Sequence, residues 1–185
     1  MRVVAGTLRG RSIVAPDGDS TRPTTDRTRE AVFNALASLD VVEDAVVIDL
    51  FAGSGAMGIE ALSRGARRCT FIERDRRALD AIRTNVAKLG VSDRANVVAG
   101  DVFANVVAQR LADLVIADPP YDFEQWSDLL RVLTPALAPG GLVVAESGRE
   151  IEIPDGWEVR RARKYGRTWV AFLERSGPTT ATVGS

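Results

Sequence analysis

The sequence predicts an α/β domain built on a mainly parallel sheet of seven strands, closed by an antiparallel hairpin at its C-terminal end. Three observations predict this fold. Short apolar segments alternate with helical ones from residue 45 to residue 146, a glycine-rich loop follows the first of these strands, and two further strand-like segments come near the end of the chain. Apolar strands that alternate with helices are typical of a parallel sheet covered by helices on both faces.

A small N-terminal extension precedes this alternation. Residues 3–6 and 12–15 each resemble a short strand, and the glycines between them indicate a β-hairpin. From Thr25 or Asp26 onward, apolar residues follow the spacing of an amphipathic helix, and Asp26 is a candidate N-cap.

The main domain then follows in order. We expect its strands at residues 45–50, 69–73, 96–99, 114–117 and 142–146. The intervening helices are expected at residues 57–64, 77–88, 102–109 and 126–137. Pro139, Gly140 and Gly141 should end the last helix. The closing hairpin is expected to pair residues 157–163 with residues 168–173.

These elements divide the chain into three parts. We expect an extension over residues 1–24, a main domain over residues 25–175 and a flexible tail over residues 176–185. The longest apolar runs are too short to span a bilayer, and the start of the chain has no apolar signal core. We therefore expect a soluble, cytoplasmic protein, and nothing in the sequence requires more than a monomer.

The composition excludes several kinds of catalysis. The chain has no histidine and a single cysteine, Cys69. Nucleophilic catalysis by Ser-His-Asp or Cys-His, zinc sites built from cysteine and histidine, and disulfides are thereby excluded. We expect no metal site, so the chemistry depends on carboxylates, hydroxyls, backbone groups or an organic cofactor.

The charge of the chain is unevenly distributed. Residues 1–29 carry a net +3 and residues 157–175 a net +4, so the rest carries −8 within a total of −1. Two basic ends are expected of a nucleic-acid-binding protein if they meet in space, although a solvated, salt-bridged surface would look the same. The arginines that we expect to grip RNA phosphates are Arg9, Arg11, Arg22, Arg27 and Arg29. Arg22 and Arg27 could instead hold the N-terminal helix to the sheet through carboxylates.

A cofactor site is predicted by the segment Gly53-Ser54-Gly55-Ala56-Met57-Gly58, which follows a strand and opens a helix. Glu73 comes 20 residues after the first of these glycines, the offset expected for an acid that binds ribose hydroxyls. Both a dinucleotide and S-adenosylmethionine fit this loop. Asp49 favours S-adenosylmethionine, because an acid there can reach an ammonium group but would be unhelpful beside a pyrophosphate.

Four acids follow or end successive strands: Asp49, Glu73, Asp101 and Asp118. Ligands bind at the carboxyl edge of an open α/β sheet, so we expect these side chains to line one crevice. Asp101 would accept from an adenine amine beside Val102, although capping of a turn would equally explain it. The residues expected to hold the cofactor are Asp49, Phe51, Ala52, Gly53, Ser54, Gly55, Glu73, Arg74, Asp101, Val102 and Asp118.

The catalytic candidates are Asp118, Pro119, Pro120 and Tyr121, directly after the fourth strand. An amine on an aromatic base is a poor nucleophile because its lone pair is delocalised into the ring. A carboxylate at Asp118 and the carbonyl of Pro119, each accepting one N–H, would localise that lone pair on nitrogen. The prolines fix the backbone, and Tyr121 can stack on the base. This segment therefore predicts methylation of an exocyclic amine.

The sequence resembles the bacterial RsmD-type 16S rRNA guanine-N2 methyltransferases from Arg2 to about Phe172. Met57 departs from the leucine that is usual there, and Tyr121 is often phenylalanine in relatives. The most specific part of the resemblance is Arg22-Pro23-Thr24 with Asp26-Arg27 and Arg29-Glu30-Ala31. The other segments that carry it are Arg2-Val3-Val4-Ala5-Gly6, Arg9-Gly10-Arg11, Phe33-Asn34, Asp49-Leu50-Phe51-Ala52-Gly53-Ser54-Gly55, Glu60-Ala61-Leu62-Ser63-Arg64-Gly65-Ala66 and Asp118-Pro119-Pro120-Tyr121.

This resemblance implies a Rossmann-like class I S-adenosylmethionine-dependent methyltransferase. Its implied target is the N2 amine of guanine 966 in 16S rRNA, within the small ribosomal subunit or a late precursor. Two alternatives stay open. The same residues permit an adenine-N6 amino methyltransferase acting on DNA or RNA, and a non-catalytic RNA-binding assembly factor could keep the fold.

Overall fold

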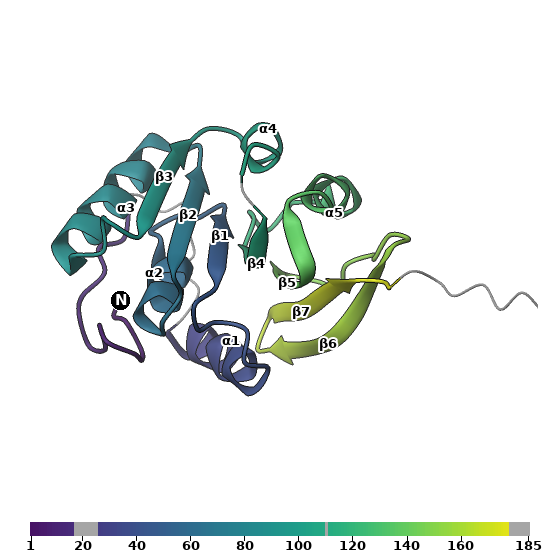
Figure 1. Ribbon diagram of the computed structural model, residues 1–185, viewed down its shortest axis with the longest axis horizontal. Helices are drawn as coiled ribbons and strands as arrows, with labels where there is room; N and C mark the ends of the chain where they lie inside the picture. Colours follow the sequence, from purple (N-terminus) through teal and green to yellow (C-terminus); the bar gives the residue numbers. More distant parts are fainter. Residues whose placement is uncertain (17–25, 110, 178–185) are drawn as a thin grey trace, which may run out of the picture.

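A seven-stranded sheet forms the centre of the computed structural model, which describes residues 1–16, 26–109 and 111–177 (Figure 1). Its strand order is β3-β2-β1-β4-β5-β7-β6; the first five strands are parallel, and β7 runs antiparallel to both of its neighbours. The strands are β1 (Val46–Leu50), β2 (Arg68–Glu73), β3 (Ala95–Ala99), β4 (Ala112–Ala117), β5 (Leu137–Ser147), β6 (Trp157–Tyr165) and β7 (Thr168–Arg175). The predicted fold class is confirmed.

The helices cover both faces of this sheet (Figure 1). They are α1 (Asp26–Ser38), α2 (Ala56–Ser63), α3 (Arg76–Leu89), α4 (Val102–Val106) and α5 (Trp126–Leu133). Helices α1, α2 and α3 pack in one apolar core, and α4 and α5 in the other. Side chains alternate between the cores along each strand: Val47 belongs to the first, Ile48 to the second. In the described ranges, every helix is too short or too polar to cross a bilayer.

The expected N-terminal hairpin forms, but it is short. An antiparallel bridge joins Arg2 and Ser12, and backbone hydrogen bonds link Val3 to Arg11 and Gly10 and Met1 to Ile13. The backbone N–H groups of Val4 and Ala5 donate instead to the carboxylate of Glu60, at 2.8 and 3.0 Å, and therefore do not join a β-ladder. The segment also contributes three residues to the first core: Val3, Leu8 and Ile13.

The connection between α5 and β5 also differs from the prediction. The helix expected to reach residue 137 ends at Leu133, and Pro139, Gly140 and Gly141 lie inside β5. The pairing of β4 with β5 shifts between Ala112 and Leu114, so β5 carries extra residues there. A Cβ at Gly141 would lie 2.8 Å from the Leu137 side chain, which explains a glycine at this irregularity.

The other helix and strand boundaries agree more closely with the prediction. Helix α4 is shorter than expected and ends at Val106, and β4 begins two residues early, at Ala112. Asp26 begins α1, and its Oδ1 accepts from Arg29 at 2.8 Å. Thr25 lies outside the described residues.

Candidate active site

The carboxyl ends of the central strands border an open cleft of about 1900 Å³. The loop after β1, the ends of β2 and β5 and the segment after β4 form its floor, while α1 and the turn between β6 and β7 contribute at its rim. Figure 1 shows this turn beside α1. Arg27 of α1 and Arg167 of this turn therefore both line the cleft.

The glycine-rich loop has the backbone that its sequence predicts. Phe51, Gly53 and Gly55 have positive φ angles of 54°, 55° and 77°. Gly55 precedes the first residue of α2. A Cβ at Gly58 would lie 2.4 Å from the ring of Phe71, so only glycine allows α2 to pack this closely on β2.

Two acids hold this loop in place. Glu73 Oε2 accepts from the N–H of Gly53 at 2.9 Å, and its Oε1 accepts from the N–H groups of Arg74 and Asp75. A carboxylate has about four acceptor positions, and three are used here, so Glu73 keeps one, on Oε2, for a hydroxyl donor. Asp49 accepts from the N–H of Gly58 at 2.8 Å. Burial, then nearby Asp118 and Glu73, raise the pKa of Asp49 well above its usual range, against the hydrogen bond from Gly58.

The segment after β4 lies beside this loop because β1 and β4 are neighbouring strands. Asp118, Pro119, Pro120 and Tyr121 all line the cleft. The carbonyl of Pro120 accepts from the N–H of Phe123 at 2.9 Å, which fixes the turn. Tyr121 is 72% exposed, and a Cβ at Gly148 would lie 2.3 Å from its ring.

Most of the predicted cofactor residues border the cleft: Asp49, Phe51, Ala52, Gly53, Ser54, Glu73, Arg74 and Asp118. Of the described residues, Gly55, Asp101 and Val102 are not in its lining. Asp101 is exposed and caps α4, accepting from the N–H groups of Phe103 and Ala104. The capping interpretation therefore accounts for Asp101, while Val102 is buried in the second core.

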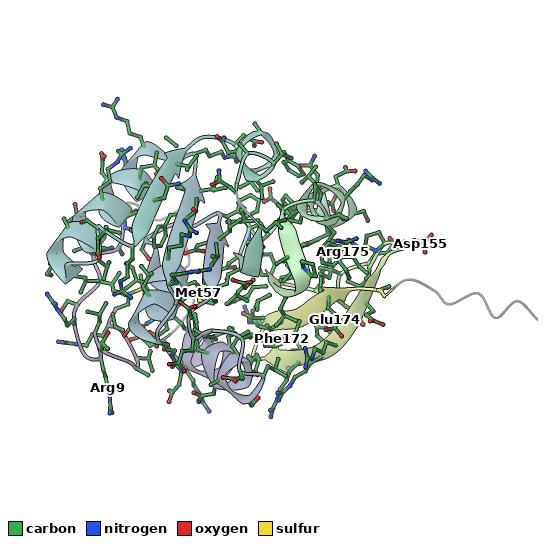
Figure 2. All side chains as sticks on the ribbon, viewed as in Figure 1. Arg9, Met57, Asp155, Phe172, Glu174 and Arg175 are labelled. Atoms are coloured by element: carbon green, nitrogen blue, oxygen red, sulfur yellow. The ribbon has the colours of Figure 1, made fainter. Side chains whose placement is uncertain are left out.

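The predicted RNA-binding arginines fall into different environments. Arg27 is exposed on α1 and lines the cleft, and Arg9 projects from the periphery of the molecule (Figure 2). Arg11 donates to the carbonyls of Lys88 and Leu89 and so also braces the end of α3. Arg22 lies outside the described residues.

Arg29 was predicted wrongly. Its side chain is fully buried, and it pairs with Asp26 at 2.8 Å and with Glu60 at 3.5 Å. It also donates to the carbonyl of Arg2. A guanidinium held in this way cannot reach an RNA phosphate, so Arg29 is a structural residue.

Sequence reasoning missed three groups of residues at the cleft. The first is the basic set on the β6–β7 hairpin, which the charge distribution marked only as part of a basic end and not as site residues: Arg161, Arg163, Lys164 and Arg167, all exposed. The second is the aromatic pair Phe123 and Trp126, with ring centroids 5.3 Å apart; Phe123 also contacts Phe51, which was predicted, and Phe103, which does not line the cleft. The third is Glu146 at the end of β5, whose position at the carboxyl end of a predicted strand was the signal that could have found it.

Comparison with known proteins finds a family model and relatives that are named as rRNA methyltransferases. A family model described as "Conserved hypothetical protein 95" matches residues 1–174. The chain is 37% identical to "Putative rRNA methyltransferase YlbH" of Bacillus subtilis, over 96% of this chain and all of the relative. It is 35% identical to "Ribosomal RNA small subunit methyltransferase D" of Escherichia coli, over 95% of this chain and 90% of the relative.

Solved structures agree with these relatives. The structure of "Putative methyltransferase yhhF from Escherichia coli" superposes with a TM-score of 0.82 at 36% sequence identity, covering 95% of this chain and 97% of that chain.

Proposed function

Because the chain belongs to the RsmD family, which the model "Conserved hypothetical protein 95" describes, we propose that it methylates the exocyclic N2 amine of guanine 966 in 16S rRNA. The methyl donor is S-adenosylmethionine, and the substrate is the small ribosomal subunit or a late precursor of it. The observation that carries this proposal is the pairing of β1 with β4, since it brings the glycine-rich loop and Asp118 to one cleft.

The residues at the cleft fit S-adenosylmethionine. Glu73 keeps one acceptor position for a ribose hydroxyl, and its hydrogen bond from Gly53 holds it against the loop. Asp49, Asp118 and Glu146 make the floor acidic, which suits a ligand that carries a sulfonium and an ammonium group. When bound, this cofactor supplies an electrophilic methyl group on a cationic sulfur. Val102 and Asp101 stay predictions as partners of the adenine.

The residues after β4 activate the target amine. Asp118 and the carbonyl of Pro119 accept its two N–H groups and localise the lone pair on nitrogen. Tyr121 stacks on the base, a contact worth roughly 1–3 kcal/mol, after the base has left its own stack. No strong general base is required, because the methylated amine is an acidic ammonium that loses its proton readily. Positioning of the amine supplies most of the rate.

The rim of the cleft binds the RNA backbone. Arg27 on α1 and the basic residues of the β6–β7 hairpin, including Arg163 and Lys164, line the same cleft. Arg9 extends this surface, since Arg9 and Arg27 border the same shallow depression. Phosphate contacts of this kind are independent of base sequence and weaken with salt. We keep Arg22 and the N-terminal extension as part of the proposed RNA contact.

The test is transfer of radiolabelled methyl groups from S-adenosylmethionine to unmodified small subunits, naked 16S rRNA and duplex DNA, with the product nucleoside identified by mass. We expect N2-methylguanosine from a ribosomal substrate. Label in adenine alone would favour the adenine-N6 alternative. Binding of S-adenosylmethionine with no transfer to any of the three substrates would contradict the proposed activity.

A further inference from the structure

Glu146 lies beside Asp118 at the floor of the cleft. Ala117 of β4 pairs with Ala145 of β5, so Asp118 and Glu146 are the next residues on two neighbouring strands. Such strands are about 4.8 Å apart. Ile116 and Val144, two residues earlier, both pack in the first core. Because side chains alternate along a strand, Asp118 and Glu146 point toward that same face, and both line the cleft.

The surroundings of Glu146 leave its carboxyl group unsatisfied. Only 2% of the residue is exposed, and its Oε1 has no hydrogen-bond partner among the described residues. A buried polar atom without a partner is costly, so it indicates a site that a ligand completes. Burial, then the nearby Asp118 and Asp49, raise the pKa of Glu146, against the opposing effect of Arg29.

A purely structural role does not account for this arrangement. Arg29 is the nearby cation, but it already pairs with Asp26 and Glu60. Arg29 Nε also lacks a hydrogen-bond partner in the described chain, so it does not bond to Glu146. A metal does not explain the carboxyls either, since no group of described acids has the arrangement of a metal site.

We propose that Glu146 is a positioning residue for the target base, which accepts the N1–H of guanine while Asp118 and Pro119 hold the N2 amine. This role rests on the proposed function. In guanine the N1–H and the N2 amine lie on adjacent ring positions, which matches two acceptors on adjacent strands. Adenine presents a bare lone pair at N1, which an ionised carboxylate would repel. Either form of the carboxyl group has an oxygen that accepts the N1–H of guanine, but only the ionised form rejects adenine, because a neutral carboxyl group would donate its O–H to adenine N1.

The test replaces the target guanine by 2-aminopurine, in small subunits reconstituted with a 16S rRNA that carries the analogue at that position. 2-Aminopurine keeps the amine at C2 but has neither the N1–H nor O6. We expect wild-type kcat/KM to be roughly 10- to 100-fold lower on 2-aminopurine than on guanine. Glu146→Ala should lower kcat/KM on guanine by a similar factor and affect 2-aminopurine little, so that its preference between the two bases falls to near unity.

Glu146→Gln is the matched control, because it keeps the size of the side chain and a carbonyl acceptor. It should retain the preference for guanine. Glu146→Met fills the same space without an acceptor, and it gives the same test if the alanine variant does not fold. A loss of activity in Glu146→Ala or Glu146→Met that is equal on both bases, with the preference intact, would overturn the role of Glu146. If wild type methylates neither substrate, the proposed function itself fails, and the role of Glu146 with it.

Discussion

Arg29 and Glu60 form an ion pair in which both side chains are fully buried, with Arg29 Nε 3.5 Å from Glu60 Oε2. The same Glu60 carboxylate accepts from the N–H groups of Val4 and Ala5 and from Arg64 Nε. One carboxylate therefore joins α1, α2 and the N-terminal segment. This network fixes α1, which carries Arg27, and the segment that carries Arg9 beside the cleft.

Arg29→Ala should lower the free energy of unfolding by about 3–5 kcal/mol, because it leaves Glu60 buried without its partner. Urea denaturation of the purified protein measures this change. Arg9→Ala is the control at an exposed site and should change stability by no more than about 0.5 kcal/mol. Equal stability of the Arg29 and Arg9 variants would contradict the structural role of Arg29.

Arg27→Gln and Arg163→Gln should each weaken RNA binding and reduce the slope of log affinity against log salt by about one. Both side chains border the cleft, and each lost phosphate contact releases one fewer counterion. Affinity for the ribosomal substrate is measured over a range of salt. Arg131→Gln, on α5 and paired with Asp128, is the control and should leave the slope unchanged. An unaltered slope in the Arg27 and Arg163 variants would show that the rim of the cleft does not bind RNA phosphates.

Gly58→Ala should destabilise the protein by about 1–3 kcal/mol, although alanine is the better helix former. The added methyl group would lie 2.4 Å from the Phe71 ring and 2.5 Å from Cys69 Sγ, so α2 would have to move away from β2. Thermal unfolding measures the loss, with Gly177→Ala as the control, since no atom lies within 4 Å of a Cβ there. A Gly58→Ala protein as stable as wild type would show that this packing tolerates the shift.

The difference in stability between Glu146→Gln and wild type should shift in favour of the variant as the pH rises. The pKa of Glu146 is raised by burial, then by Asp118 on β4 and Asp49 on β1, while Arg29 on α1 opposes the shift; the paired residue on β7 is the apolar Val170. From about pH 4.5 upward, the unfolded chain therefore releases a proton that the folded chain retains, and wild-type stability falls until the pH passes the folded pKa. Glutamine has no such proton to lose.

The Tm difference between Glu146→Gln and wild type should therefore be larger at pH 8 than at pH 5. Glu152→Gln, at an exposed site, controls for the loss of one negative charge. A difference that does not change with pH would show that Glu146 titrates alike in the folded and unfolded chains.

The sequence was sufficient for the sheet and for Asp49, Glu73 and Asp118 at the cleft, because strand ends in a parallel sheet converge whatever the details of the loops. The fourth predicted acid, Asp101, caps α4 outside the cleft lining. The burial of Arg29 could have been predicted from the sequence. Arg29 stands three, four and seven residues before Val32, Phe33 and Leu36, all buried in α1, so helical spacing alone put it on the buried face. The general expectation that arginine is exposed outweighed that pattern.

Other features depend on contacts that no local pattern encodes. The N-terminal hairpin pairs only around Arg2 and Ser12, because Glu60, more than 50 residues away, takes the N–H groups of Val4 and Ala5. The glycines of β5 lie in a strand because its register with β4 shifts, a property of the pair and not of either segment. The basic residues near Arg163 became part of the site only when the fold brought their hairpin to α1.

The most direct test of the account is complementation of an Escherichia coli strain that lacks its own ribosomal RNA small subunit methyltransferase D. We predict that this chain restores one N2-methylguanosine in 16S rRNA, located by mass analysis of nuclease fragments. In a timed assay with purified enzyme, Asp118→Ala should be roughly 100- to 1000-fold slower, while calorimetry shows a much smaller loss of S-adenosylmethionine binding. Normal methylation by Asp118→Ala, or no restored N2-methylguanosine from a wild-type protein that is expressed and binds the cofactor, would contradict the account.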